Sequence, residues 1–143
     1  MSTTAIPIER KAPDRLYIGG EWVESAAGQS FEVRNPATGE VLARVPEAGT
    51  ADIDAAVQAA REAFAGPWSR LNAAQRGALI WKLADAIEAR AGELARLESL
   101  DNGKPIRESM IDLREVVDTF RYFAGWATKI EGSTIDVSIG GRR

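Results

Sequence analysis

The spacing of apolar residues changes at about Thr50, and this change constrains the fold more than any other feature of the sequence. Before Thr50, short segments such as residues 31–34 alternate between apolar and polar side chains, which is typical of half-buried strands. After it, apolar residues recur at helical spacing and mark one face of each segment. The sequence therefore predicts strand pairs followed by a layer of helices.

Two strand pairs are expected in the first part of the chain. Gly19 and Gly20 can supply the positive φ of a tight hairpin turn between the first two strands. Residues 35–40 begin with Asn-Pro and contain Gly39, which are turn signals between the next two. The predicted strands cover residues 16–18, 22–24, 31–34 and 41–45.

Four helices are expected to follow. The first is predicted to start with Thr50 as its N-cap and to stop at Gly66, with Trp68 in the loop beyond it. Asn72 and Gln75 resemble a capping box for the second helix. The third follows a break at residues 91–92, and the fourth covers residues 106–130 after a turn at 101–105. A last strand is expected at residues 134–138. The fold class is α/β, or α+β for this chain taken alone.

Composition excludes several classes of chemistry. The chain has no cysteine and no histidine, so it offers no thiol or imidazole catalyst, no disulfide and no zinc site of the usual kind. No glycine-rich phosphate loop is present. The net charge of −3 and the lack of a dense basic run argue against a nucleic-acid partner. No apolar stretch is long enough to span a membrane. We expect a cytoplasmic protein.

The remaining chemical candidates favour structural roles. Acidic residues such as Asp52, Asp54 and Glu98 lie on predicted helices and are interpreted as solvated surface. Lys104 is interpreted as a turn lysine, because the loop that would make it a phosphate ligand is missing. The four tryptophans are too scattered to stack bases, so core or interface packing is predicted for them.

The order of six segments is more specific than any single motif. These segments are YIGGEWV at 17–23, VRNPATGEV at 33–41, AVQAAREAF at 56–64 with Trp68, LADAIE at 83–88, ESLDNGKP at 98–105 and RYFAGWA at 121–127. Together they closely resemble the start of the NAD(P)-dependent aldehyde dehydrogenase superfamily, and the resemblance covers nearly the whole chain.

This resemblance implies an enzyme much longer than the present chain. In the family, a cysteine thiolate attacks the aldehyde, a hydride passes to NAD or NADP, and a glutamate helps water release the acid. The resemblance places those residues, the oxyanion-binding asparagine and the glycine-rich cofactor contacts beyond this chain. It therefore carries over no catalytic and no cofactor-binding residue. The full-length enzyme is expected to bind an aldehyde substrate and to be a homo-oligomer.

Two sets of residues do match family sites. Many members bind K⁺ or Na⁺, mainly through backbone oxygens, and the matching positions are Val33, Arg34 and Asp101. The alternative is that Asp101 only caps its turn. Ile111 and Glu115 match positions near the substrate entrance. By the same resemblance, residues 1–15 are an N-terminal arm, 16–132 belong to the Rossmann-like cofactor-binding domain, and 133–143 begin an oligomerisation strand.

Three hypotheses of different classes follow. In the first, the chain is the N-terminal part of an aldehyde dehydrogenase and is inactive alone. In the second, it is a non-catalytic interaction module that docks on a full-length relative through exposed apolar surface. The third is a small enzyme that uses only carboxylates, which requires a cleft with a perturbed Asp or Glu pair.

Overall fold

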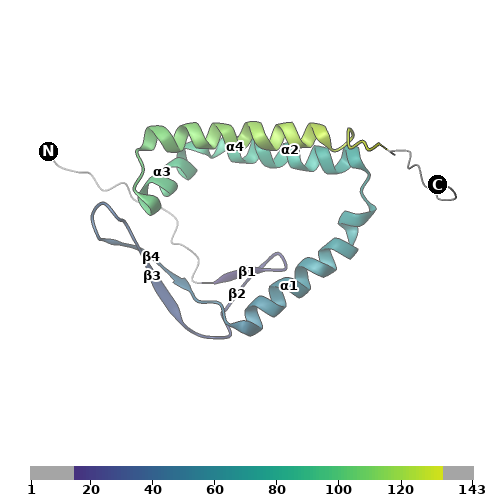
Figure 1. Cartoon of the computed structure of the whole chain (residues 1–143). Helices are drawn as coiled ribbons and strands as arrows, with labels where there is room; N and C mark the ends of the chain where they lie inside the picture. The colour runs from purple at the N-terminus through teal and green to yellow at the C-terminus, as the bar shows by residue number, and fades with distance from the viewer. Residues whose placement is uncertain (1–14, 134–143) are drawn as a thin grey trace, which may run out of the picture.

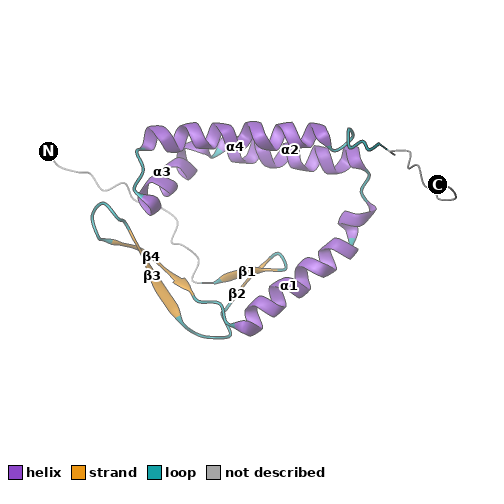
Figure 2. Cartoon of the chain, in the orientation of Figure 1, coloured by secondary structure: helices purple, strands orange, loops and turns teal. Residues whose placement is uncertain are grey.

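The computed structural model describes residues 15–133, and these form two strand pairs and a set of helices (Figure 1, Figure 2). The arm at residues 1–14 and the strand predicted at 134–138 lie outside the described residues. The elements are β1 (Leu16–Ile18), β2 (Glu21–Val23), β3 (Ser30–Arg34), β4 (Val41–Pro46), α1 (Thr50–Ala65), the 3-10 helix η1 (Pro67–Arg70), α2 (Ala73–Ala89), α3 (Ala91–Asn102) and α4 (Ile106–Trp126).

Both predicted strand pairs are present and antiparallel. β1 pairs with β2 from Leu16 opposite Val23, and the two glycines of the intervening turn have φ of +64° and +91°. β3 pairs with β4, with an irregularity in register between Val33 and Arg34. The positive φ values explain the glycines, because other residues rarely adopt that conformation. Each sheet among the described residues has only two strands.

Some helix boundaries differ from those predicted from the sequence, and one predicted cap is confirmed. The N-cap of α1 is Gly49 rather than Thr50, because the Asp52 carboxylate accepts the Gly49 N–H and fixes the helix start one residue earlier. The capping box at Asn72 and Gln75 is confirmed, with both reciprocal hydrogen bonds at 2.9 Å. Trp68 lies in η1 rather than in a loop. Helix α4 ends at Trp126, four residues before the predicted end.

Helices α2, α3 and α4 pack together, and Figure 1 shows α2 and α4 side by side. The two helices approach closely at Gly77 of α2, where a Cβ atom would lie 2.7 Å from the backbone oxygen of Ala124 in α4. At the other end of α4, the Oγ atoms of Ser99 and the fully buried Ser109 are 2.9 Å apart. The buried apolar residues of the described chain belong to this layer: Ala84, Ala95, Leu113, Val117 and Ala124.

Helix α1 does not bury its apolar face. Ile53, Val57 and Phe64 share one face, as their spacing predicts, but each is exposed and Phe64 is 78% exposed. In Figure 1, α1 diverges from the layer of α2 and α4. Among residues 15–133, no helix is both long and apolar enough to cross a membrane.

The close approach of α2 and α4 gives a first prediction. Gly77→Ala should lower the free energy of unfolding by about 1–3 kcal/mol, because the new methyl group meets a backbone oxygen that cannot rotate away. The control is Gly92→Ala in α3, where a Cβ meets nothing within 4 Å, and which should be neutral or slightly stabilising. Urea unfolding of both variants is the measurement. Equal stability of the two would contradict the packing.

Candidate functional site

The segments predicted to hold a monovalent cation meet in the structure. The turn after β3 is built on Asn35, which is 9% exposed and whose Oδ1 accepts the Ala37 N–H at 2.9 Å. The backbone of Asn35 also exchanges hydrogen bonds with Glu40 and Gly39, at 2.9 and 2.8 Å. These bonds fix the chain direction immediately after Val33 and Arg34.

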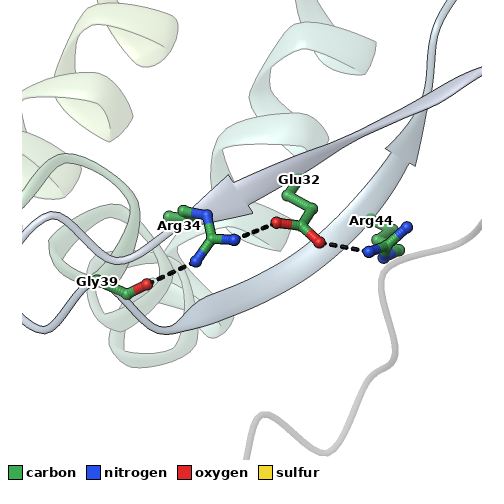
Figure 3. Close-up of polar contacts among 4 residues, drawn as sticks. All are labelled: Glu32, Arg34, Gly39 and Arg44. Carbon is green, nitrogen blue, oxygen red and sulfur yellow. Dashed lines mark hydrogen bonds and ion pairs between the residues drawn. The ribbon is translucent and has the colours of Figure 1, made fainter.

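The side chain of Arg34 braces this turn from outside. Its guanidinium donates to the Gly39 oxygen at 2.9 Å and pairs with Glu32, which also pairs with Arg44 of β4 (Figure 3). The arginines therefore share one carboxylate across the strand pair. The Arg34 side chain is a cation and pairs with Glu32, so it cannot bind a metal cation. The predicted ligands at Val33 and Arg34 are therefore their backbone oxygens.

The third predicted ligand lies near the same turn. Asp101 is the second-last residue of α3, and Gly103 ends that helix with φ of +81°. A Cβ at Gly103 would lie 2.9 Å from Cγ of Pro36, so the α3–α4 turn sits directly on the Asn35–Pro36 turn. The side chain that accepts a backbone N–H within the α3–α4 turn is Asn102, which bonds the Lys104 N–H at 2.9 Å. Asp101 itself is exposed.

The chemistry of this junction is that of backbone oxygens. Within residues 15–133, no group of three acidic side chains is placed to hold a metal ion. A cation at Val33, Arg34 and Asp101 would therefore depend on carbonyl oxygens and one carboxylate, which are hard ligands suited to K⁺ or Na⁺.

Lys104 is a structural lysine, as predicted from the sequence. Its Nζ lies 2.6 Å from Oε1 of Glu98 in α3 and also pairs with Asp112 in α4. Hydrogen bonds that Lys104 donates to Asp112 and Glu98 raise its pKa above the ordinary value, so it stays protonated. This ion cluster joins the two helices next to the turn that carries the candidate cation site.

The two residues predicted at a substrate entrance lie on α4. Ile111 and Glu115 are one turn apart and both are exposed. Glu115 lines a shallow groove of about 320 Å³ together with Asp112, Val116, Thr119 and Phe120. The groove is open to solvent along one side of the helix, so these residues form a surface rather than an enclosed pocket.

Asp52 was predicted to be solvated surface, and this prediction is wrong. Its side chain is 6% exposed and accepts hydrogen bonds from the Ala26 N–H at 3.0 Å, the Gly49 N–H at 2.9 Å and the Ser25 hydroxyl at 3.0 Å. These donors, led by the Ala26 N–H, hold the pKa of Asp52 below its usual range. Asp52 therefore fastens the 25–27 loop to the start of α1.

The carboxylate-only enzyme finds no support in these groups. Asp52 and Glu88 are acidic side chains with a shifted pKa, and hydrogen-bond donors lower the pKa of each. A general acid that works near neutral pH needs the opposite shift. Both carboxylates serve as structural acceptors.

Arg121 is a feature that sequence reasoning missed. From α4 it donates to Asp85 at 2.8 Å and to Glu88 at 2.6 Å in α2, and its guanidinium carbon lies 5.5 Å from the Trp81 ring centroid. The hydrogen bond to Glu88, followed in size of effect by the one to Asp85, raises the pKa of Arg121 above its ordinary value. The spacing of Asp85 and Glu88, three residues apart, was the available signal. The four tryptophans are each at least 42% exposed, so none of them lies in the core of the described residues, and the alternative of interface packing stays a prediction: Trp22, Trp68, Trp81 and Trp126.

The Asp52 contacts predict how stability depends on pH. Because folding lowers the pKa of Asp52, its ionised side chain stabilises the folded state above the unfolded-state pKa of about 3.9. This stabilisation is lost as the pH falls through the lowered, folded-state value. Asp52→Asn should lower the melting temperature near neutral pH and reduce the further loss in acid. Thermal unfolding across the acid range is the measurement. Asp54→Asn, an exposed residue of the same helix turn, should change neither quantity.

The described residues form two strand pairs and a helical layer, and the sequence contains no cysteine or histidine that could act as a nucleophile. Residues 22–143 match the aldehyde dehydrogenase family. The chain is 52% identical over 126 residues to a putative aldehyde dehydrogenase, DhaS, of Bacillus subtilis. It is 51% identical over 126 residues to retinal dehydrogenase 2 of Homo sapiens. These alignments cover 87% and 86% of this chain, and 26% and 24% of the relatives.

Solved structures that resemble this chain are also aldehyde dehydrogenases. An NAD⁺ complex of aldehyde dehydrogenase from Bacillus cereus matches 92% of this chain with a TM-score of 0.82 and 50% identity. A betaine aldehyde dehydrogenase variant from Staphylococcus aureus in complex with NAD⁺ matches 90% with a TM-score of 0.81 and 43% identity. This chain belongs to the aldehyde dehydrogenase family. It spans about a quarter of the length of the relatives it matches.

Proposed function

We propose that this chain is the N-terminal part of an enzyme that oxidises aldehydes to carboxylic acids with NAD⁺ or NADP⁺, and that it catalyses nothing alone. Family membership over residues 22–143 supports the oxidoreductase class, and the NAD⁺ complexes of two relatives support the cofactor. The single observation that carries the claim of inactivity is the absence of cysteine and histidine from a family segment.

In the complete enzyme, this chain would have a structural role. Its helical layer would support the cofactor-binding domain, and its α4 face with Ile111 and Glu115 would border the entrance used by the aldehyde. When bound to the complete protein, the nicotinamide would accept the hydride. We propose no contact between the nicotinamide and the residues of this chain. We further propose that the complete protein is a homo-oligomer and works in the cytoplasm, because this part of it contains no cysteine and therefore no disulfide that reducing conditions would break.

The activity proposal is tested with the purified chain. Incubated with NAD⁺ or NADP⁺ and a panel of aliphatic and aromatic aldehydes, it should form no reduced cofactor above the rate of a blank without protein. The intact Bacillus cereus enzyme serves as the positive control. Aldehyde-dependent formation of NADH in proportion to the amount of this chain would contradict the proposal.

We also propose that Val33, Arg34 and Asp101 contribute to a K⁺ or Na⁺ site. Support comes from the contact between Pro36 and Gly103, which brings together the two turns that carry these residues. If a cation bridges them, KCl should raise the melting temperature more than tetramethylammonium chloride at equal ionic strength. Asp101→Asn should remove that difference, whereas Glu40→Gln, an exposed acid in the neighbouring turn, should keep it. Identical melting in both salts would count against the site.

A further inference from the structure

The turn between α3 and α4 contains the dipeptide Asn102-Gly103, which is chemically reactive in its own right. The chain has asparagines at positions 35, 72 and 102, and of these only Asn102 precedes a glycine. The carboxamide of an asparagine can be attacked by the nitrogen of the next peptide bond. The attack is easiest before glycine, because glycine has no Cβ to shield that nitrogen and its backbone rotates freely. The dipeptide is therefore a candidate site of spontaneous modification.

The local geometry holds the reacting side chain beside the backbone that follows it. Asn102 is exposed to solvent, and its Oδ1 accepts the Lys104 N–H at 2.9 Å. This hydrogen bond keeps the carboxamide along the chain, as the side chains of asparagines do in turns of this kind. Because Cγ is bonded to Oδ1, the carbon that the Gly103 nitrogen must reach lies close to the backbone of residues 103 and 104.

Other contacts of the same turn restrain the reaction. The Gly103 N–H donates to the Ser99 oxygen at 3.0 Å and closes the last turn of α3. A nitrogen that attacks Cγ loses this proton, so the hydrogen bond must open first. Lys104 opposes the opening, because its Nζ lies 2.6 Å from Oε1 of Glu98 in α3 and also pairs with Asp112 in α4. One side chain thus ties together the helices on either side of the turn.

We propose that Asn102 is a site of spontaneous deamidation and that the Lys104 ion cluster limits its rate. In the reaction, the Gly103 nitrogen loses its proton and bonds to Cγ of Asn102. The side-chain nitrogen takes up a proton and leaves as ammonia. Water then opens the cyclic imide that results. Attack of water at one carbonyl gives aspartate, and attack at the other gives isoaspartate, in which the main chain runs through the side-chain carboxyl carbon.

The modification would change the turn that meets the β3–β4 turn. Either product replaces a neutral carboxamide next to Asp101 by a carboxylate, and isoaspartate also adds one carbon to the main chain. A longer main chain has little room there, because a Cβ at Gly103 would already lie 2.9 Å from Cγ of Pro36. The isoaspartate form, separated by ion exchange, should therefore melt at a lower temperature than the unmodified chain. Equal melting of the two forms would contradict this consequence.

The test is incubation of the purified chain at mildly alkaline pH, followed by mass spectrometry of its tryptic peptides. Deamidation is detected as the mass gained when the carboxamide NH₂ becomes OH. We expect Asn102 to react at least about tenfold faster than Asn72, which is also exposed but precedes an alanine. Asn35 should not react by this route, because the nitrogen of Pro36 carries no proton. Equal rates at Asn102 and Asn72 would overturn the proposal.

Two variants test whether the ion cluster limits the rate. Lys104→Gln should speed deamidation of the folded chain roughly twofold to fivefold, as expected from the loss of partly exposed ion pairs. The matched control is Lys82→Gln, which removes an exposed lysine of α2 and should keep the parent rate.

Unfolding separates the effect of the cluster from a direct chemical effect of residue 104. In concentrated urea, the parent chain and both variants should deamidate at one common rate, which should be faster than that of the folded parent. A rate at Asn102 that urea does not increase would overturn the proposal. So would equal rates for Lys104→Gln and Lys82→Gln in the folded state.

Discussion

The contact between Gly77 of α2 and the Ala124 carbonyl of α4 is the interaction on which the rest of the described structure depends. Without a side chain at Gly77, the two helices approach closely enough for alanines to fill the space between them. The core of residues 15–133 is accordingly made mostly of small residues, and its larger buried apolar side chains are Leu113 and Val117. A core this thin contributes little hydrophobic free energy, so its geometry matters more than its area.

Charged groups hold the two ends of this layer. Lys104 bridges Glu98 and Asp112 where α3 turns into α4, and Arg121 binds Asp85 and Glu88 farther along α4. These clusters are partly exposed, so their contribution is better described as fixing register than as supplying stability. Next to the first of them, Gly103 lies against Pro36, so the β3–β4 turn contacts the helical layer there.

Local features were predictable from sequence because they depend on few neighbouring residues. The Gly19-Gly20 turn, the Asn35 turn and the Asn72–Gln75 capping box each follow from conformational preferences within six residues. The resemblance to the aldehyde dehydrogenase family was also readable, since it rests on the order of several segments. Lys104 could be assigned to a turn because the loop needed for another role was absent.

Long-range features were not predictable. Nothing near Asp52 in the sequence indicates that Ser25 and Ala26 would turn their donors toward it, and so a buried carboxylate looked like surface. Helical periodicity shows that Ile53, Val57 and Phe64 share a face, but it does not show what covers that face. The same limit applies to the tryptophans, which stay about half exposed although Trp22 contacts Tyr17, Trp81 contacts Arg121 and Trp126 contacts Tyr122.

Amide hydrogen exchange of the isolated chain tests the central claim, that the α2–α4 contact holds the structure while α1 and the strand pairs lack a covering partner. Slow exchange is predicted for α4 around Leu113 to Ala124 and for the facing turns of α2 near Gly77. Fast exchange is predicted for β1, β2 and most of α1. Uniformly slow exchange across all these elements would contradict the account, because it would mean that the exposed faces are already covered.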